Sequence, residues 1–175
     1  MRRISWNAET RDIVFRSLVA LAILFVIALL QTSFLPYVDL FGAIPDLLLI
    51  FVVGVSFFNG ERVGLPFSMG AGLVGYFLGG GAALSILFYF LCGVLASRGF
   101  WGRNYLSWCM YMGAACLLKL LWSFLYCLLA SALPRPFAAL WQSILPELLG
   151  TLLLSAVLYY PVKFAARAIK KKSEQ

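Results

Sequence analysis

The sequence predicts an all-α membrane protein, a bundle of six transmembrane helices with both termini in the cytoplasm. The 175 residues are 63% hydrophobic and only 12% charged, and the mean hydropathy is +0.94. A soluble domain is nearer half apolar and a quarter charged, so this composition excludes an ordinary cytosolic protein. Each span needs about 20 residues, so the chain holds roughly six spans in a single membrane domain.

Six apolar segments follow one another along the chain. They are 13–35, 44–58, 63–78, 82–96, 105–133 and 137–162, with a break expected at Pro146 in the last. The first has a basic start but no small-x-small cleavage site, so we expect an uncleaved helix rather than a signal peptide. Segments two to four are shorter than a usual span, which implies either thinned lipid or helices sheltered inside the bundle.

The distribution of basic residues predicts the orientation. With the N-terminus inside, the cytoplasmic side holds twelve of the fourteen lysines and arginines. These are Arg2, Arg3, Arg11, Arg16, Arg62, Arg98, Arg103, Lys163, Arg167, Lys170, Lys171 and Lys172. Such an excess is typical of cytoplasmic loops. Residues 1–12 and 163–175 are therefore predicted as a cytoplasmic N-terminus and a basic cytoplasmic tail, and the glycines at 79–81 separate the third and fourth spans.

Two Pro-acid pairs resemble helix starts near the outer interface. Proline suits the first helical position, and a carboxylate complements the positive end of the helix dipole. Pro45-Asp46 lies at the start of the second segment, and Pro146-Glu147 forms the same pattern in the sixth. Alternatively, the two acids could receive a basic group from a partner.

An apolar helix face is predicted just before the Pro146-Glu147 pair. Residues on it recur at helical spacing: Phe137, Leu140, Trp141, Ile144 and Leu145. This stretch either lies along the outer membrane surface or forms the first turns of a kinked sixth helix.

Lys119 lies about halfway along the fifth segment, between leucines. A lysine near the bilayer centre costs about 2.5–3.5 kcal/mol, so an intramembrane charge indicates a functional site by default. Three alternatives remain open: a pair with Glu147, a contact with a partner helix, or extension of the ammonium toward an interface.

A stripe of small residues marks the third segment as a close-packing face. Its members are Gly64, Ser68, Gly72, Gly75 and Gly79. Small residues at such spacing let membrane helices approach closely. We expect the contact to lie within the chain, although a second chain is the alternative.

No catalytic, metal-binding or cofactor-binding pattern is found. The chain has no histidine, the usual general base and metal ligand. The four cysteines, Cys92, Cys109, Cys116 and Cys127, lie in apolar runs and form no CxxC motif. The sequence contains no basic stripe interleaved with stacking aromatic residues, the pattern that would indicate nucleic-acid binding. We therefore expect a transporter subunit or an assembly scaffold without enzymatic activity.

The stretch 29–98 resembles the rod-shape-determining protein family MreD. The shared pattern is a series of short motifs: Leu30-Gln31-Thr32, Pro36, Phe41-Gly42, Pro45-Asp46-Leu47-Leu48-Leu49, Gly60, Arg62, Gly64, Gly70-Ala71-Gly72-Leu73, Gly79-Gly80, Leu84 through Tyr89 and Gly93-Val94-Leu95-Ala96. One departure is Tyr76, where the family often has an acidic residue.

The resemblance implies a non-catalytic scaffold in the inner membrane of rod-shaped bacteria. Members of the family bind the single-span protein MreC directly. They share a complex with MreB filaments, the RodA glycosyltransferase and a class B penicillin-binding protein. Their fold is thought similar to the six-helix substrate-binding subunits of energy-coupling-factor vitamin transporters, and such a subunit is the alternative function. The expected MreC contact is the outer hairpin, with Gln31, Pro36, Gly42, Pro45 and Asp46.

Overall fold

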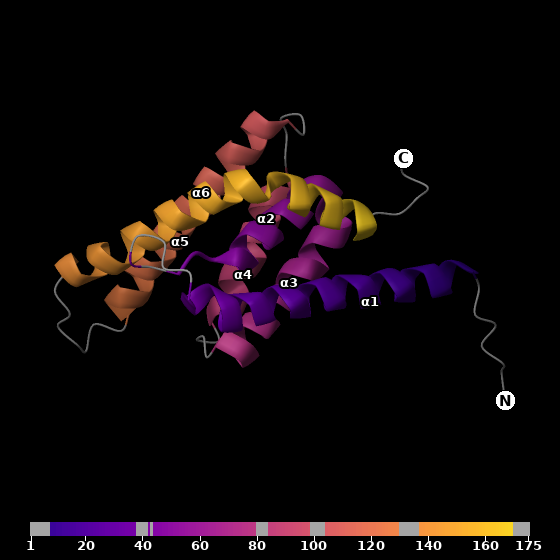
Figure 1. The fold of residues 1–175 in the computed structure, drawn as a ribbon, viewed down its shortest axis with the longest axis horizontal. Helices are drawn as coiled ribbons and strands as arrows, with labels where there is room; N and C mark the ends of the chain where they lie inside the picture. Colours follow the sequence, from indigo (N-terminus) through magenta and orange to yellow (C-terminus); the bar gives the residue numbers. More distant parts are fainter. Residues whose placement is uncertain are drawn as a thin grey trace.

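The structure is a computed structural model that describes residues 8–37, 42, 44–79, 84–98, 104–129 and 137–169. These residues form six α-helices and no strand, which confirms the prediction of an all-α protein (Figure 1). The helices are α1 (Ala8–Leu29), α2 (Leu47–Asn59), α3 (Glu61–Gly79), α4 (Leu84–Ser97), α5 (Tyr105–Leu129) and α6 (Phe137–Ile169).

The end of α1 widens before the chain turns toward α2. A π-helical turn, Leu30–Phe34, follows α1 directly, and a short 3-10 turn, Leu35–Tyr37, completes it. The hydroxyl of Thr32 donates to the carbonyl of Ala28, four residues earlier, at 2.9 Å. Such π turns are rare and occur often at functional sites. Here the turn carries Gln31, which contacts the start of α2.

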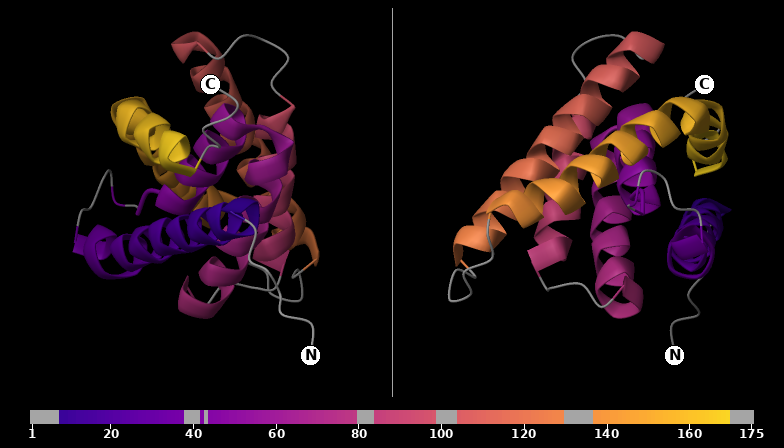
Figure 2. Two further views of the ribbon diagram at one scale, coloured as in Figure 1. Left: turned by 90° about the vertical axis from the view of Figure 1, so that its right-hand side faces the viewer. Right: turned by 60° about the vertical axis from the view of Figure 1, so that its left-hand side comes forward.

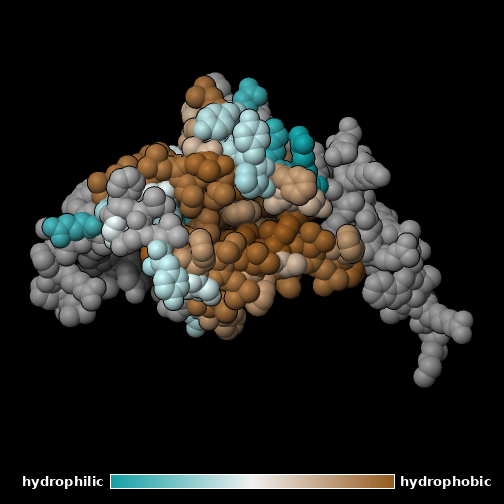
Figure 3. Space-filling view, viewed as in Figure 1, coloured by the Kyte–Doolittle hydropathy of each residue, from teal (hydrophilic) through white to brown (hydrophobic). Residues whose placement is uncertain are grey.

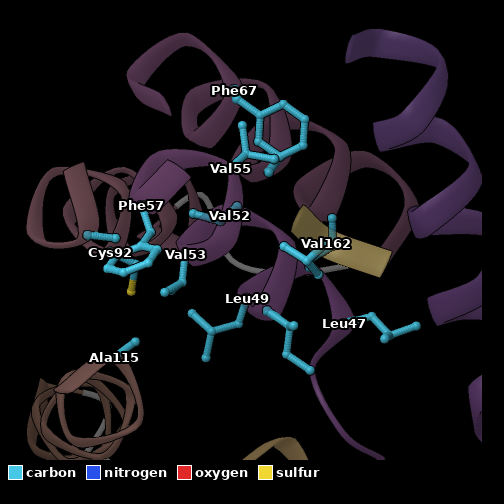
Figure 4. Packing of buried hydrophobic residues seen from close by; sticks show 14 of the residues in the cluster. Leu47, Leu49, Val52, Val53, Val55, Phe57, Phe67, Cys92, Ala115 and Val162 are labelled. Atoms are coloured by element: carbon cyan, nitrogen blue, oxygen red, sulfur yellow. The ribbon is translucent and has the colours of Figure 1, made fainter. Parts of the chain in front are cut away.

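The shortest helix, α2, forms the centre of the bundle. At 1.5 Å per residue its 13 residues are about 20 Å long. Nearly all of them are buried, and α2 contacts each of the other five helices. Figure 4 shows side chains of α3, α4, α5 and α6 around it, namely Phe67, Cys92, Ala115 and Val162. Of the two explanations for a short segment, the structure therefore favours shelter inside the bundle for α2.

The small residues of α3 lie against α2 and α4. A Cβ added to Gly64 would lie 2.6 Å from the backbone of Ser56 in α2, and one added to Gly72 would lie 2.7 Å from that of Ile86 in α4. Ser68 lies directly against Gly93 of α4. The stripe therefore packs within the chain.

The two remaining stripe positions lie farther along α3. A Cβ on Gly75 would make ordinary contacts with Tyr89 and Leu48, at 3.4 and 3.6 Å. Gly79 is the last residue of the helix, while residues 80 and 81 lie outside the described part of the chain.

A second close approach joins α2 to α5 and α6. At Gly54 an added Cβ would collide with Val162 of α6 and lie 3.1 Å from the ring of Trp108 in α5. The indole of Trp108 is fully buried and donates to the carbonyl of Ser155 at 3.3 Å. Its ring stacks on Phe58 at a centroid distance of 6.1 Å. Only glycine at position 54 allows this packing.

The sixth helix is continuous through Pro146, so the break expected there is wrong. Both Pro146 and Pro161 lie inside α6, which bends in its C-terminal part (Figures 1 and 2). Membrane helices tolerate proline because neighbouring groups satisfy the freed backbone carbonyls. The apolar stretch 137–145 forms the first turns of this helix, which was the second of the two alternatives. The helix also continues to Ile169, into the stretch expected to be a basic tail; residues 170–175 lie outside the described part.

Three helical stretches are long and apolar enough to cross a membrane. Within the described residues they are Ser17–Tyr37, Tyr105–Phe124 and Ile144–Ile169. The surface carries many exposed large apolar side chains, including Phe15 and Leu21 on α1 and Val157 and Phe164 on α6. Figure 3 shows a broad hydrophobic area across one face of the molecule. Lipid contact accounts for this surface better than water does.

Candidate functional site

A buried cluster of three charged side chains joins α2, α5 and α6. The ammonium of Lys119 lies 2.7 Å from Oδ2 of Asp46 and 2.6 Å from Oε1 of Glu147. The side chains of Lys119 and Asp46 are 15% and 7% exposed, and that of Glu147 is 30% exposed. We call these three residues the ion-pair cluster. One ammonium thus bridges two carboxylates that lie far apart in the sequence.

The position of Asp46 follows from its role as the N-cap of α2. Its Oδ1 accepts a hydrogen bond from the backbone N–H of Leu49 at 3.0 Å. This satisfies one of the N–H groups that the start of a helix leaves free, and the carboxylate complements the helix dipole. The hydroxyl of Tyr89 in α4 also donates to the carboxylate, at 3.2 and 3.1 Å. The predicted helix start is therefore present, with Pro45 and Asp46 just before the first helical residue.

Polar side chains of two other helices hold this helix start in place. Gln31 donates from Nε2 to the carbonyl of Pro45 at 3.1 Å, and its Oε1 accepts from the N–H of Leu47 at 2.7 Å. The N–H of Asp46 donates to Oγ1 of Thr151 at 2.9 Å. The Thr151 hydroxyl then donates to the carbonyl of Glu147, one turn earlier in α6, at 2.7 Å. The backbone around Asp46 is thus fixed to α1 and α6.

The contacts of Lys119 distinguish between the alternatives that the sequence left open. Lys119 pairs with Glu147 within the chain, and it also pairs with Asp46. Two carboxylates at hydrogen-bonding distance stabilise the charged ammonium in an apolar bundle, where an unpaired lysine would be costly. The expectation that Glu147 begins a helix is wrong, because α6 starts ten residues earlier at Phe137.

A polar cavity of about 270 Å³ opens beside the ion-pair cluster. All three charged residues line it, together with Gln31 and Tyr89. The remaining lining residues are Ala28, Thr32, Leu48, Val74, Gly75, Leu78 and Ser85. The hydroxyl oxygen of Ser85 is buried and has no hydrogen-bond partner in the described part of the chain. The cavity therefore combines charged, hydroxyl and aliphatic walls.

The structure divides the residues expected to contact a partner into two groups. Asp46 is 5% exposed, and its carboxylate binds Lys119, Tyr89 and the N-terminus of α2. Gln31 uses both ends of its amide to brace α2, and Pro45 is buried. The polar side chains of Gln31 and Asp46 thus bond within the chain. Pro36 and Gly42 are exposed and remain available.

Sequence reasoning did not assign roles to Tyr89, Thr151 or Ser85. Thr151 lies 105 residues from its partner Asp46, and no local pattern indicates such a contact. A single tyrosine or threonine in an apolar segment carries no spacing signal. Among the described residues, no group of three or more His, Cys, Asp or Glu side chains could hold a metal ion.

Fold and site together define an all-helical protein with membrane-spanning character and a buried, cavity-lining charge cluster. No family model, curated protein or solved structure matches the chain.

Proposed function

We propose that the protein is a non-catalytic membrane scaffold of the MreD type. It binds MreC and helps couple MreB filaments to peptidoglycan synthesis by RodA and its class B penicillin-binding partner in the inner membrane. The observation that carries the proposal is the ordered series of motifs between residues 29 and 98. The described chain is almost entirely helical, so its partners must be engaged through helix faces and short connections.

The proposed topology has six membrane crossings with both termini in the cytoplasm. Contacts at one end of the bundle support it. Glu61 at the start of α3 lies 3.8 Å from Arg98 after α4, so the two connections predicted as cytoplasmic lie together. Asn59 at the end of α2 donates to the carbonyl of Ala166 in α6 at 2.9 Å. The C-terminal part of α6 therefore reaches the same basic end, as the positive-inside rule requires.

An apolar groove between α1, α2 and α6 is the proposed binding site of the MreC transmembrane helix. Its volume is about 570 Å³. The lining is wholly apolar: Ala22, Ile23, Val26, Ile27, Leu30, Phe34, Leu35, Pro45, Leu47, Phe51, Leu154 and Leu158. It continues to the hairpin that carries the exposed Pro36, where an external domain would leave the membrane. Van der Waals packing against such a surface is what drives helix association in lipid.

The test is affinity purification of the tagged protein from native membranes in mild detergent, with mass spectrometry of the copurifying proteins. We expect MreC and cell-wall synthases. A Val26→Trp variant fills the groove and should reduce the recovery of MreC. Leu21→Trp is the matched control, because Leu21 is exposed on the same helix but lies outside the groove. Equal recovery of MreC with both variants would contradict the groove assignment, and absence of MreC from the wild-type sample would contradict the function.

The polar cavity favours a second candidate function, the substrate-binding subunit of an energy-coupling-factor vitamin transporter. Small-molecule sites combine an apolar lining with a few convergent polar groups, and the cavity beside Lys119 has both. In that case the purification would recover two ATPase subunits and a helical coupling protein in place of MreC.

A further inference from the structure

The ion-pair cluster carries an excess of negative charge. It contains two carboxylates and one ammonium, which gives a formal charge of −1 at neutral pH. In a low-dielectric membrane interior an uncompensated charge is costly, and carboxylates there pair with other groups. The arrangement therefore has room for one more positive charge.

The two carboxylates are compensated unequally. Asp46 receives hydrogen bonds from Lys119, from the Tyr89 hydroxyl and from the Leu49 N–H at the positive end of α2. The Glu147 carboxylate shares Lys119, but it lies inside α6 and caps no helix start. It is also the more exposed of the two carboxylates. The unbalanced negative charge therefore lies at Glu147, at the wall of the cavity.

The cavity beside Glu147 has both the space and a hydrogen-bonding group for a ligand. Its volume of about 270 Å³ is well above the roughly 30 Å³ share of one water molecule in the liquid. The hydroxyl oxygen of Ser85 is buried in its lining without a partner among the described residues. Buried polar atoms are almost always hydrogen-bonded, so this hydroxyl can take a hydrogen bond from an occupant of the cavity.

We propose that this cavity binds an organic monocation with N–H donors, a guanidinium or primary ammonium group on an alkyl stem. Its N–H groups donate to the Glu147 carboxylate and to the Ser85 hydroxyl oxygen. The aliphatic wall formed by Leu48, Val74 and Leu78 packs against the stem. The cation brings the charge of the site to zero. The inference rests on the cavity and its charges, so it applies under either proposed function.

The direct test measures binding of methylguanidine to the purified protein in detergent by isothermal titration calorimetry and by the shift in unfolding temperature. We expect saturable binding to the wild-type protein. Glu147→Gln keeps the shape of the side chain but removes its charge, and it should weaken binding at least about tenfold. Glu61→Gln is the matched control, because Glu61 is an exposed acid outside the cavity, and it should bind as the wild type does.

Two further probes keep the test decisive. Tetramethylammonium has the same charge but no N–H donor, so it should bind much more weakly than methylguanidine. Ser85→Leu fills the cavity without changing its charged residues, so it should abolish binding even where Glu147→Gln fails to fold. Three results would overturn the proposal. They are no binding of methylguanidine to the wild type, undiminished binding to Glu147→Gln or Ser85→Leu, and equal binding of tetramethylammonium and methylguanidine.

The natural source of the cation is either a free small molecule or a basic side chain of a partner protein. Mass spectrometry of the protein extracted from native membranes distinguishes them. A copurifying small organic cation supports a free ligand. A protein partner that millimolar methylguanidine releases from both the wild type and the Glu61→Gln control, and that tetramethylammonium does not release, supports a partner side chain. Release by both cations alike would contradict binding through N–H donors.

Discussion

Replacement of Lys119 by methionine tests whether the ion-pair cluster holds the bundle together. Methionine fills a similar volume but leaves Asp46 and Glu147 without their shared cation. At an effective dielectric constant of about 20, Coulomb's law gives roughly 6 kcal/mol for each ammonium–carboxylate contact at 2.7 and 2.6 Å. Desolvation of the ammonium offsets several kcal/mol of this attraction. We therefore expect Lys119→Met to lower the free energy of unfolding by about 3–5 kcal/mol, the usual cost of breaking a buried pair.

The assay is reversible unfolding in mixed detergent micelles with increasing dodecyl sulfate, followed by far-ultraviolet circular dichroism. The companion variant combines Lys119→Met with Asp46→Asn and Glu147→Gln. It removes every charge of the cluster, so it should recover most of the lost stability, because neutral replacement of a whole buried ion pair is often nearly neutral. A loss below about 1 kcal/mol for Lys119→Met alone, or a triple variant less stable than the single one, would refute the reasoning.

Three further changes test other parts of the structure in the same unfolding assay. Gly54→Ala should cost about 1–3 kcal/mol or more by overpacking, whereas Gly113→Ala, with nothing within 4 Å of its added Cβ, should be neutral or slightly stabilising; equal effects would contradict the close approach of α2 to α6. Thr151→Val should cost about 1–3 kcal/mol, because the buried N–H of Asp46 loses its acceptor; an unchanged unfolding curve would show that this bond is dispensable. Glu61→Gln removes an ion pair that is more than half exposed on both sides, so it should change stability by less than about 1 kcal/mol; a larger loss would mean that the pair links the two connections more tightly than its exposure indicates.

The sequence determined the class of fold and the chemistry available to the site. Hydrophobic runs of helical length predict helices because each backbone group in lipid must find its partner within the same segment. The same logic marked Lys119, with Glu147 as a candidate partner, since a charge in an apolar run is costly unless it is paired. The Pro45-Asp46 pair identified the start of α2 because N-cap preferences are local.

Only the tertiary structure decided which of these residues meet. The partners of Lys119 lie 73 and 28 residues away, and their meeting depends on how α2, α5 and α6 pack. The same packing buries Asp46, a candidate partner contact, and pairs it with Lys119 within the chain. At Pro146 the tertiary structure overrides a local sequence signal. Proline by itself predicts the end of a helix, but α6 continues past Pro146 because the helix is packed in the bundle. Local preferences determine where helices begin, whereas long-range packing decides which faces become buried and which remain free to bind.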